Sequence, residues 1–301
     1  MKGLVTGVGG QLGHDVMNEL ASRGMAGIGS DIADVYSGIA DGTPVTEMPY
    51  VKMDITDGEQ VKLALEEAAP DFVVHCAAWT AVDRAEEMPE ACRKVNALGT
   101  ENIAKYCGEH DIPMMYFSTD YVFDGSGTRP WQPDDERHPL GVYGETKAEG
   151  ELAVLKYVPR SFILRIAWVF GTNGNNFIKT MLRLAKTHDT LRVVNDQIGT
   201  PTYTYDLARL LVDMAETERY GYYHATNEGG YISWYDFTCE IYRQAGMNTR
   251  VVPVPPAEDG LSKAARPFNS RLDKSKLREA GFTPLPDWKD ALARYLEILN
   301  K

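Results

Sequence analysis

A hydroxyl, a phenol and an ammonium group occur at positions that suit proton transfer to a carbonyl oxygen. Thr119 closes an apolar run, and Tyr143 and Lys147 follow it with four-residue spacing between them. On a helix, this spacing places the phenol and the ammonium on one face. A cation beside a tyrosine favours the phenolate, and so lowers a pKa that is ordinarily near ~10. We predict that Tyr143 passes a proton to the oxygen, that Thr119 hydrogen-bonds the same oxygen, and that Lys147 lowers the pKa of Tyr143.

A glycine-rich turn near the start of the chain indicates a dinucleotide site. A short apolar strand leads into Gly7, Gly10 and Gly13, and apolar residues at helical spacing follow. Such glycines let the backbone approach a pyrophosphate, which then rests on the N-terminus of the helix. The next strand ends on Asp31, where an acceptor for a ribose 2′-hydroxyl is expected. The motif predicts NADPH or NADH as cofactor, and Asp31 favours use of NADH at least as well as NADPH.

Composition excludes several classes of protein. The chain has 301 residues, of which 44% are hydrophobic, and this is ample for a packed core. A formal net charge of −12 argues against a nucleic-acid surface. The four cysteines form no Cys-x-x-Cys pair and no cluster with histidine, so we expect free thiols and no metal. No apolar run approaches ~18 residues, so we expect no membrane span and a cytoplasmic protein.

Apolar, β-rich segments alternate with helical patterns through the first half of the chain. This alternation predicts an α/β fold, a Rossmann-like doubly wound parallel sheet. Within it we expect one long helical stretch at 87–110 and a surface loop over the site at 124–140. We predict a dinucleotide-binding domain at residues 1–170. Residues 171–301 would form mainly a smaller C-terminal substrate-binding lobe, with some segments returning to the first domain.

Several strings resemble the dTDP-4-dehydrorhamnose reductase family, within the extended short-chain dehydrogenase/reductase superfamily. Besides the glycine turn and the Tyr/Lys pair, they occupy residues 80–86, 118–125, 165–171, 175–183 and 194–202. The resemblance runs from Met1 to at least Asp273. It implies NAD(P)H-dependent reduction of the 4-keto group of a dTDP-4-keto-6-deoxy sugar, from dTDP-4-dehydrorhamnose to dTDP-L-rhamnose, in the last step of dTDP-rhamnose biosynthesis.

The resemblance also implies roles for matching residues. The catalytic residues would be Thr119, Tyr143 and Lys147, with Lys147 also binding the nicotinamide ribose. The substrate contacts would be Thr80, Thr119, Asp120, Tyr121 and Trp168. The cofactor contacts would be Gly7, Gly10, Gln11, Leu12, Gly13, Asp31, Asp54, Ile55, Ala77, Ala78, Trp79, Tyr143 and Lys147. The pair His75-Cys76 departs from the Asn-Ala of relatives, and we expect His75 to be a core histidine rather than a base.

Other interpretations stay open at this point. Trp168 could be a core aromatic, and Asp54 and Asp120 could be capping carboxylates. A sugar 4,6-dehydratase needs a second carboxylate after the threonine, where this chain has Tyr121. An epimerase shares the superfamily, and a non-catalytic regulatory subunit like that of methionine adenosyltransferase shares the string at 118–123. The substrate expected is a nucleotide sugar, and the chain would be a monomer or a homodimer.

Overall fold

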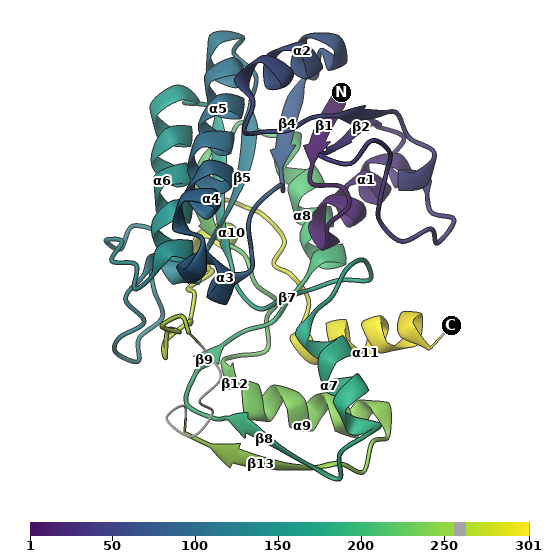
Figure 1. Ribbon diagram of the computed structural model, residues 1–301, viewed down its shortest axis with the longest axis vertical. Coiled ribbons are helices and arrows are strands. Elements are labelled where there is room, and N and C mark those ends of the chain that lie inside the picture. Colours follow the sequence, from purple (N-terminus) through teal and green to yellow (C-terminus); the bar gives the residue numbers. More distant parts are fainter. Residues whose placement is uncertain (256–262, 301) are drawn as a thin grey trace.

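A seven-stranded parallel sheet forms the centre of the larger part of the molecule (Figure 1). The computed structural model describes residues 1–255 and 263–300. Its strands lie in the order β11-β6-β5-β4-β1-β2-β3. They are β1 (Lys2–Thr6), β2 (Ala26–Asp31), β3 (Tyr50–Lys52), β4 (Phe72–His75), β5 (Met114–Thr119), β6 (Ser161–Ile166) and β11 (Gly221–His224). The order reverses between β1 and β4, and ligands bind at such a point beside the carboxyl ends of the strands. The predicted doubly wound sheet is confirmed.

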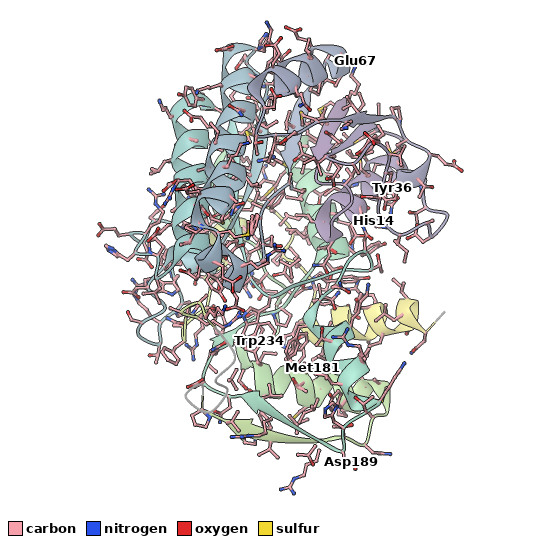
Figure 2. All side chains as sticks on the ribbon, in the orientation of Figure 1. His14, Tyr36, Glu67, Met181, Asp189 and Trp234 are labelled. Carbon is pink, nitrogen blue, oxygen red and sulfur yellow. The ribbon has the colours of Figure 1, made fainter. Side chains whose placement is uncertain are left out.

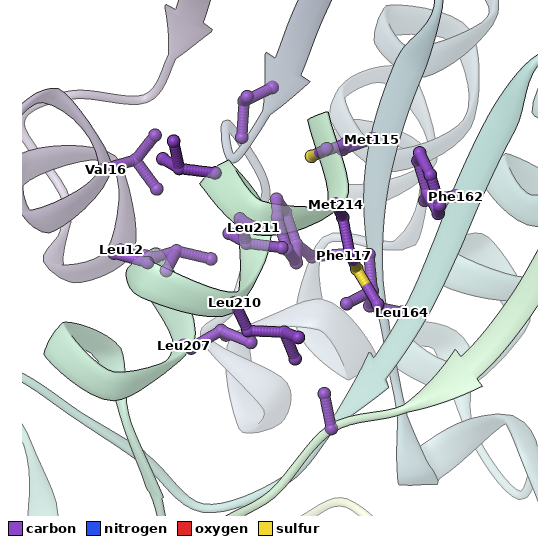
Figure 3. Close-up of a cluster of buried hydrophobic side chains, with 14 of the residues drawn as sticks. Leu12, Val16, Met115, Phe117, Phe162, Leu164, Leu207, Leu210, Leu211 and Met214 are labelled. Carbon is purple, nitrogen blue, oxygen red and sulfur yellow. The ribbon is translucent and has the colours of Figure 1, made fainter. Parts of the chain in front are cut away.

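Helices cover both faces of this sheet (Figure 1). One face carries α1 (Gln11–Ser22) and α8 (Thr204–Ala215), which pack against each other. The other carries α2 (Gly58–Ala68), α5 (Thr100–Glu109) and α6 (Val142–Tyr157). Figure 3 shows Leu207, Leu211 and Met214 of α8 between α1 and the sheet, where they meet Phe117 of β5 and Leu164 of β6. Burial on both faces explains why the central strands read as continuous apolar runs.

The helical stretch predicted at 87–110 is confirmed from Pro89 to Glu109, with a π-helical turn inside it. It consists of α4 (Pro89–Arg93), the π-helical turn η2 (Lys94–Gly99) and α5, and Met88 separates it from the short helix α3 (Val82–Glu87). Pro89 lacks a backbone N–H and therefore starts a new helix. At the end of η2, a Cβ on Gly99 would lie 2.7 Å from Ile55. The wide turn thus lets the helix backbone approach Ile55, and π-helical turns often occur at functional sites.

A smaller lobe follows β6 and lies below the sheet in Figure 1. Its helices are α7 (Phe177–Ala185), α9 (Trp234–Ala245) and α11 (Trp288–Leu299), and their shared core contains Phe170, Phe237 and Tyr295. Ser233 caps α9 in a reciprocal pair with Asp236. Its paired strands are β7 (Val169–Phe170) with β10 (Thr202–Tyr203), β8 (Thr190–Val194) with β13 (Arg250–Val254), and β9 (Ile198–Gly199) with β12 (Ile232–Ser233). Three further short helices are η1 (Pro44–Thr46), η3 (Asp120–Val122) and α10 (Ser275–Glu279).

Although α8 and β11 come after residue 170, they lie in the layers of the central sheet.

Residues 263–273, which we call the strap, connect the lobe to the loop at 124–140. Asn269 is buried, and its side-chain amide donates to the carbonyls of Ser126 and Arg129. The strap also exchanges backbone hydrogen bonds with Ile198 and with Trp131. The loop at 124–140 is therefore fastened through its backbone. Within residues 1–255 and 263–300, no helix has the length and apolar character needed to span a bilayer.

Candidate active site

A cavity of about 740 Å³ lies along the carboxyl ends of the strands and reaches the lobe. Most of the residues predicted for the site line it. They are Gly7, Gly10, Gln11, Leu12, Gly13, Asp31, Asp54, Ile55, Ala77, Ala78, Thr80, Thr119, Asp120, Tyr121, Tyr143, Lys147 and Trp168. The structure does not place Trp79 on the cavity wall, and its ring N–H donates to the Ala81 carbonyl at 3.1 Å. Within the described ranges, no group of His, Cys, Asp and Glu side chains is arranged to hold a metal ion.

The hydroxyl, phenol and ammonium singled out in the sequence meet in this cavity. Thr119 ends β5, and its hydroxyl donates to Asp120 Oδ1 at 3.0 Å and accepts from the Tyr121 N–H at 3.2 Å. Tyr143 lies in the first turn of α6, with its ring edge-on to that of Tyr121 at a centroid distance of 5.4 Å. Lys147 follows one turn later on the same helix. The cavity thus contains an acid, a hydroxyl donor and a cation around one space.

Burial shifts the pKa values of both Tyr143 and Lys147. Burial raises the pKa of Tyr143 above its ordinary value, and a hydrogen bond with Thr119 only partly opposes this. Burial also lowers the pKa of Lys147 to about 7, against the attraction of Glu151. The pKa of Tyr143 is thus raised rather than lowered as predicted, and its shift is set by burial, Thr119 and the neighbouring groups Asp120 and Tyr121. A raised pKa keeps the phenol protonated near neutral pH, as a proton donor requires.

The ammonium of Lys147 is placed to bind a ligand. It lies 4.2 Å from the centroid of the Tyr116 ring, and the Tyr116 hydroxyl donates to the Lys147 carbonyl at 3.1 Å. The residue is only 4% exposed, yet no acceptor in the described part of the chain takes a hydrogen bond from Nζ. Because an ammonium has three donors, these can reach hydroxyl groups of a molecule in the cavity.

The glycine turn has the shape that a pyrophosphate needs. Gly7 has a φ of +70°, and a Cβ there would lie 2.7 Å from the Ala77 nitrogen. A Cβ on Gly13 would lie 2.4 Å from the Gly7 carbonyl oxygen, so side chains at both positions would push the backbone apart. No side chain caps the N-terminus of α1 at Gly10, which leaves its first N–H groups toward the cavity. These donors and the positive end of the helix suit a phosphate group.

Asp31 has a role that the sequence did not show. Its Oδ2 accepts from the Gly9 N–H at 2.9 Å and its Oδ1 from the Ile32 N–H at 2.8 Å, so it fixes the glycine turn as well as lining the cavity. In the sequence Asp31 is followed by Ile32, Ala33 and Asp34, none of which is a cation, but the sheet places Lys52 of β3 in register with Asp31. The Lys52 ammonium pairs with Asp34 at 2.6 Å.

The contacts of His75, Asp54 and Asp120 distinguish structural roles from roles in the site. His75 bonds through both ring nitrogens, with Thr6 at 2.8 Å and Thr100 at 3.2 Å, which confirms a core histidine. Asp54 accepts from the Thr56 N–H at 2.9 Å and so acts as a turn cap, although it also lines the cavity. For η3, the cap is the Thr119 hydroxyl rather than the Asp120 carboxyl.

Asp120 is instead a buried carboxyl on the cavity wall. It is 2% exposed, and among the described residues its Oδ2 has no hydrogen-bond partner. Burial raises its pKa to about 6, against the nearby hydroxyls of Ser270 and Thr119, which lower it. A buried polar oxygen without a partner is costly, so a hydroxyl of a bound ligand would satisfy it.

Trp168 belongs both to the cavity and to the packing of the lobe. It has a φ of +51°, which is strained for a residue other than glycine. Its ring stacks on Trp234 of α9 with centroids 3.7 Å apart and an interplanar angle of 15°. Trp234 also lines the cavity, and Figure 2 shows it near the junction of the lobe and the larger part. The strained backbone thus presents the stacked pair to the cavity.

Sequence reasoning missed several residues that shape the site. Asn96 in η2 accepts from the Trp79 N–H at 2.8 Å and donates to the Trp79 carbonyl at 3.1 Å, which fixes the segment after β4. Asn173 donates to the carbonyls of Gly9 and Gly10 and so holds the glycine turn from the far side. Gln197, Trp234 and Ser270 line the cavity as well. The sequence signal for any of them was the asparagine-rich stretch at 173–176, which contains Asn173.

Comparisons with known proteins agree over the full length of the chain. The model of a family described as the RmlD substrate binding domain matches residues 1–301. A dTDP-4-dehydrorhamnose reductase of Aggregatibacter actinomycetemcomitans is 39% identical over 300 residues, which cover 96% of both chains. One of Streptomyces griseus is 40% identical over 303 residues, covering 98% of this chain and 93% of its own.

Two solved structures are similar to the same extent. A crystal structure of a dTDP-4-dehydrorhamnose reductase of Clostridium acetobutylicum has a TM-score of 0.90 at 38% identity and covers 100% of both chains. One of Bacillus anthracis, in complex with NADP, has a TM-score of 0.87 at 34% identity and covers 99% of both chains.

Proposed function

This chain belongs to the dTDP-4-dehydrorhamnose reductase family, and we propose that it reduces the 4-keto group of a dTDP-4-keto-6-deoxy sugar with NADPH or NADH. The product would be dTDP-L-rhamnose, in the last step of dTDP-rhamnose biosynthesis. The observation that carries the proposal is the meeting of Thr119, Tyr143 and Lys147 in one cavity with the glycine turn. A second carboxylate after Asp120, which dehydration needs, is missing, since Tyr121 occupies that position.

The residues present fit a nicotinamide dinucleotide. The turn at Gly7 and Gly13 has no room for side chains, and the uncapped start of α1 offers N–H donors to a pyrophosphate. We propose that Lys147 donates to the nicotinamide ribose and that Asp31 accepts from the other ribose. When bound, the reduced nicotinamide supplies the hydride. We also propose that residues 1–170, with α8 and β11, hold the dinucleotide and that the lobe holds the nucleotide sugar.

We propose that the chain's own groups then manage the proton and the charge. The Tyr143 O–H donates its proton to the oxygen at C4 of the sugar as negative charge develops there. The Thr119 hydroxyl hydrogen-bonds the same oxygen, and a preformed donor of this kind stabilises the transition state. The Lys147 ammonium stabilises the phenolate that remains. The free Oδ2 of Asp120 accepts from a sugar hydroxyl, and Tyr121 and Trp168 border the sugar.

One incubation tests the proposal. When the protein is incubated with NADPH and a dTDP-4-keto-6-deoxy sugar, the absorbance of the reduced nicotinamide should fall and the rhamnose product should form. Formation of an epimer without net oxidation of NADPH would favour the epimerase in its place. No turnover would favour the dehydratase or the regulatory subunit, and dTDP-glucose separates these two, because only a dehydratase converts it to the 4-keto-6-deoxy sugar.

We propose a cytoplasmic location as well, because the described cysteines Cys76, Cys92, Cys107 and Cys239 are all free thiols. The assembly proposed is a monomer or a homodimer, which sedimentation equilibrium would decide.

A further inference from the structure

The charges on the cavity wall do not match a nucleotide-sugar substrate. Among the described residues that line the cavity, the charged ones are Asp31, Asp54, Asp120 and Lys147. The proposed reaction brings in a dinucleotide with its pyrophosphate and a nucleotide sugar with its diphosphate. The N-terminus of α1 serves the first of these, while Lys147 is committed to the catalytic centre. The diphosphate of the substrate therefore needs a cation at the edge of the cavity.

Arg266 lies at this edge, next to wall residues of the substrate end. Its neighbour Pro267 lines the cavity, and its Nη1 donates to the hydroxyl of the wall residue Tyr121 at 3.3 Å. Its Nη2 pairs with Asp83 Oδ2 at 2.8 Å. The side chains of Arg266 and Asp83 are 34% and 41% exposed, so solvent and solutes reach the pair.

The strap fixes the position of this guanidinium. The second oxygen of Asp83 accepts from the backbone N–H groups of Lys263 at 3.0 Å and Ala264 at 3.1 Å. Lys263 forms its own ion pair with Glu87, one turn along α3 from Asp83. On the other side, a Cβ on Gly125 would lie 2.5 Å from the Pro267 Cα, so the strap and the loop are in close contact. Arg266 is thus held by contacts on both sides of the strap.

We propose that Arg266 is a substrate-binding residue that binds the diphosphate of the nucleotide sugar, and that Asp83 orients it. The inference rests on the proposed function and names a recognition residue within it. A guanidinium presents planar paired donors that match phosphate oxygens and can bind them in two-pronged fashion. The partly exposed ion pair with Asp83 contributes little on its own, so one guanidinium edge can exchange carboxylate for phosphate at low cost. Tyr121, already in contact with Arg266, would adjoin the same group.

Steady-state kinetics of Arg266→Gln test the proposal. The KM for the nucleotide sugar should rise about 10- to 100-fold, as expected for loss of a charged contact, while kcat and the KM for NADPH stay within about threefold. The KM of the wild type should also rise with ionic strength more steeply than that of the variant. Lys263→Gln is the matched control, because it removes a cation from the same strap whose ammonium pairs with Glu87; its KM should not change.

Asp83→Asn separates anion binding from a purely structural ion pair. Asn keeps an oxygen for the two strap N–H groups and removes the competing charge, so the KM for the nucleotide sugar should stay equal or fall. An equal rise of the KM in Asp83→Asn and Arg266→Gln would overturn the proposal, as would an unchanged KM in Arg266→Gln.

Binding of dTDP by calorimetry gives the same comparison without turnover. Arg266→Gln should weaken dTDP, whereas Arg266→Lys, which keeps the charge but not the fork, should weaken it less. Equal dTDP affinity in wild type and Arg266→Gln would overturn the proposal. This holds even if the glutamine variant has lost turnover, because binding is measured without the reaction. Failure of the proposed function can be distinguished from failure of the Arg266 proposal, because in that case the wild type itself would show no turnover.

Discussion

Replacement of Asp15 by asparagine should stabilise the protein, and by an amount that depends on pH. Asp15 lies on α1 where it packs on α8, is 7% exposed, and accepts a hydrogen bond from the Thr204 hydroxyl. Burial raises its pKa from 3.8 to about 7, the hydrogen bond from Thr204 lowers it, and the charges of Asp41 and Asp206 raise it further. Asparagine keeps the acceptor for Thr204 and never carries the charge.

The size of the effect follows from the two pKa values. Because the folded-state pKa is the higher one, the stability linked to this carboxyl is fully present below about pH 3.8 and is lost as the pH rises through about 7. The difference between these values corresponds to about 4 kcal/mol. Asp15→Asn should therefore be close to wild type in stability near pH ~4, and more stable by up to about 4 kcal/mol near pH ~8.

Urea unfolding at both pH values measures this difference. The quantity of interest is the free energy of unfolding of the variant minus that of the wild type, and we expect it to grow between the two conditions. Asp134→Asn is the control, because the Asp134 side chain is 89% exposed, so its difference should not vary with pH. The same difference for Asp15→Asn at both pH values would refute the argument, since burial would then have left the pKa of Asp15 unchanged.

Three further predictions concern the cavity. Tyr143→Phe removes only the transferable proton, so kcat should fall by ~10²–10⁴-fold while NADPH binding by fluorescence titration stays intact; a variant with more than about a tenth of wild-type kcat would contradict the assignment. Lys147→Met should raise the KM for the cofactor and remove any limb of the pH–rate profile near 7, the pKa to which burial lowers Lys147. If both stay as in wild type, the ammonium does not bind the ribose. Because we propose that Asp31 accepts from a ribose hydroxyl, and a carboxylate there would repel a 2′-phosphate, we expect NADH to be used at least as well as NADPH, and Asp31→Ala to shift the ratio of kcat/KM toward NADPH. A wild-type kcat/KM more than about tenfold higher with NADPH would show that Asp31 does not select the cofactor, and would draw attention to Lys52 on the neighbouring strand.

Local patterns in the sequence were sufficient for much of the fold. The central strands are buried on both faces, so their apolar runs stand out, and the turn at Gly7 combines strand, glycines and helix in a few residues. The π-helical turn at 94–99 was not predictable in the same way, because one wide turn barely changes the apolar spacing. The break at Met88 had one local sign, which is Pro89.

What the sequence could not provide was the environment of each group. Tyr143 and Lys147 have four-residue spacing as predicted, but their pKa values depend on burial by segments far away in the chain. The stacking of Trp234 on Trp168 joins residues 66 positions apart in number and left no mark in either segment. Likewise, Lys52 comes level with Asp31 only when β2 and β3 pair.

The strap also bears on the order in which the molecule can form. The loop at 124–140 is fastened by Asn269, Arg271 and Asp273, which are made more than a hundred residues later. During synthesis, the strands β1 to β6 can pair as they emerge, but the backbone hydrogen bonds of Gly125 and Trp131 in the loop form only after the strap has been made. Contacts of such long sequence separation form late, because closing a long stretch of chain costs entropy before any contact is gained. A ribosome-bound chain would therefore contain the strands β1 to β6 before the strap, which brings Pro267 and Ser270 to the cavity wall, completes the candidate active site.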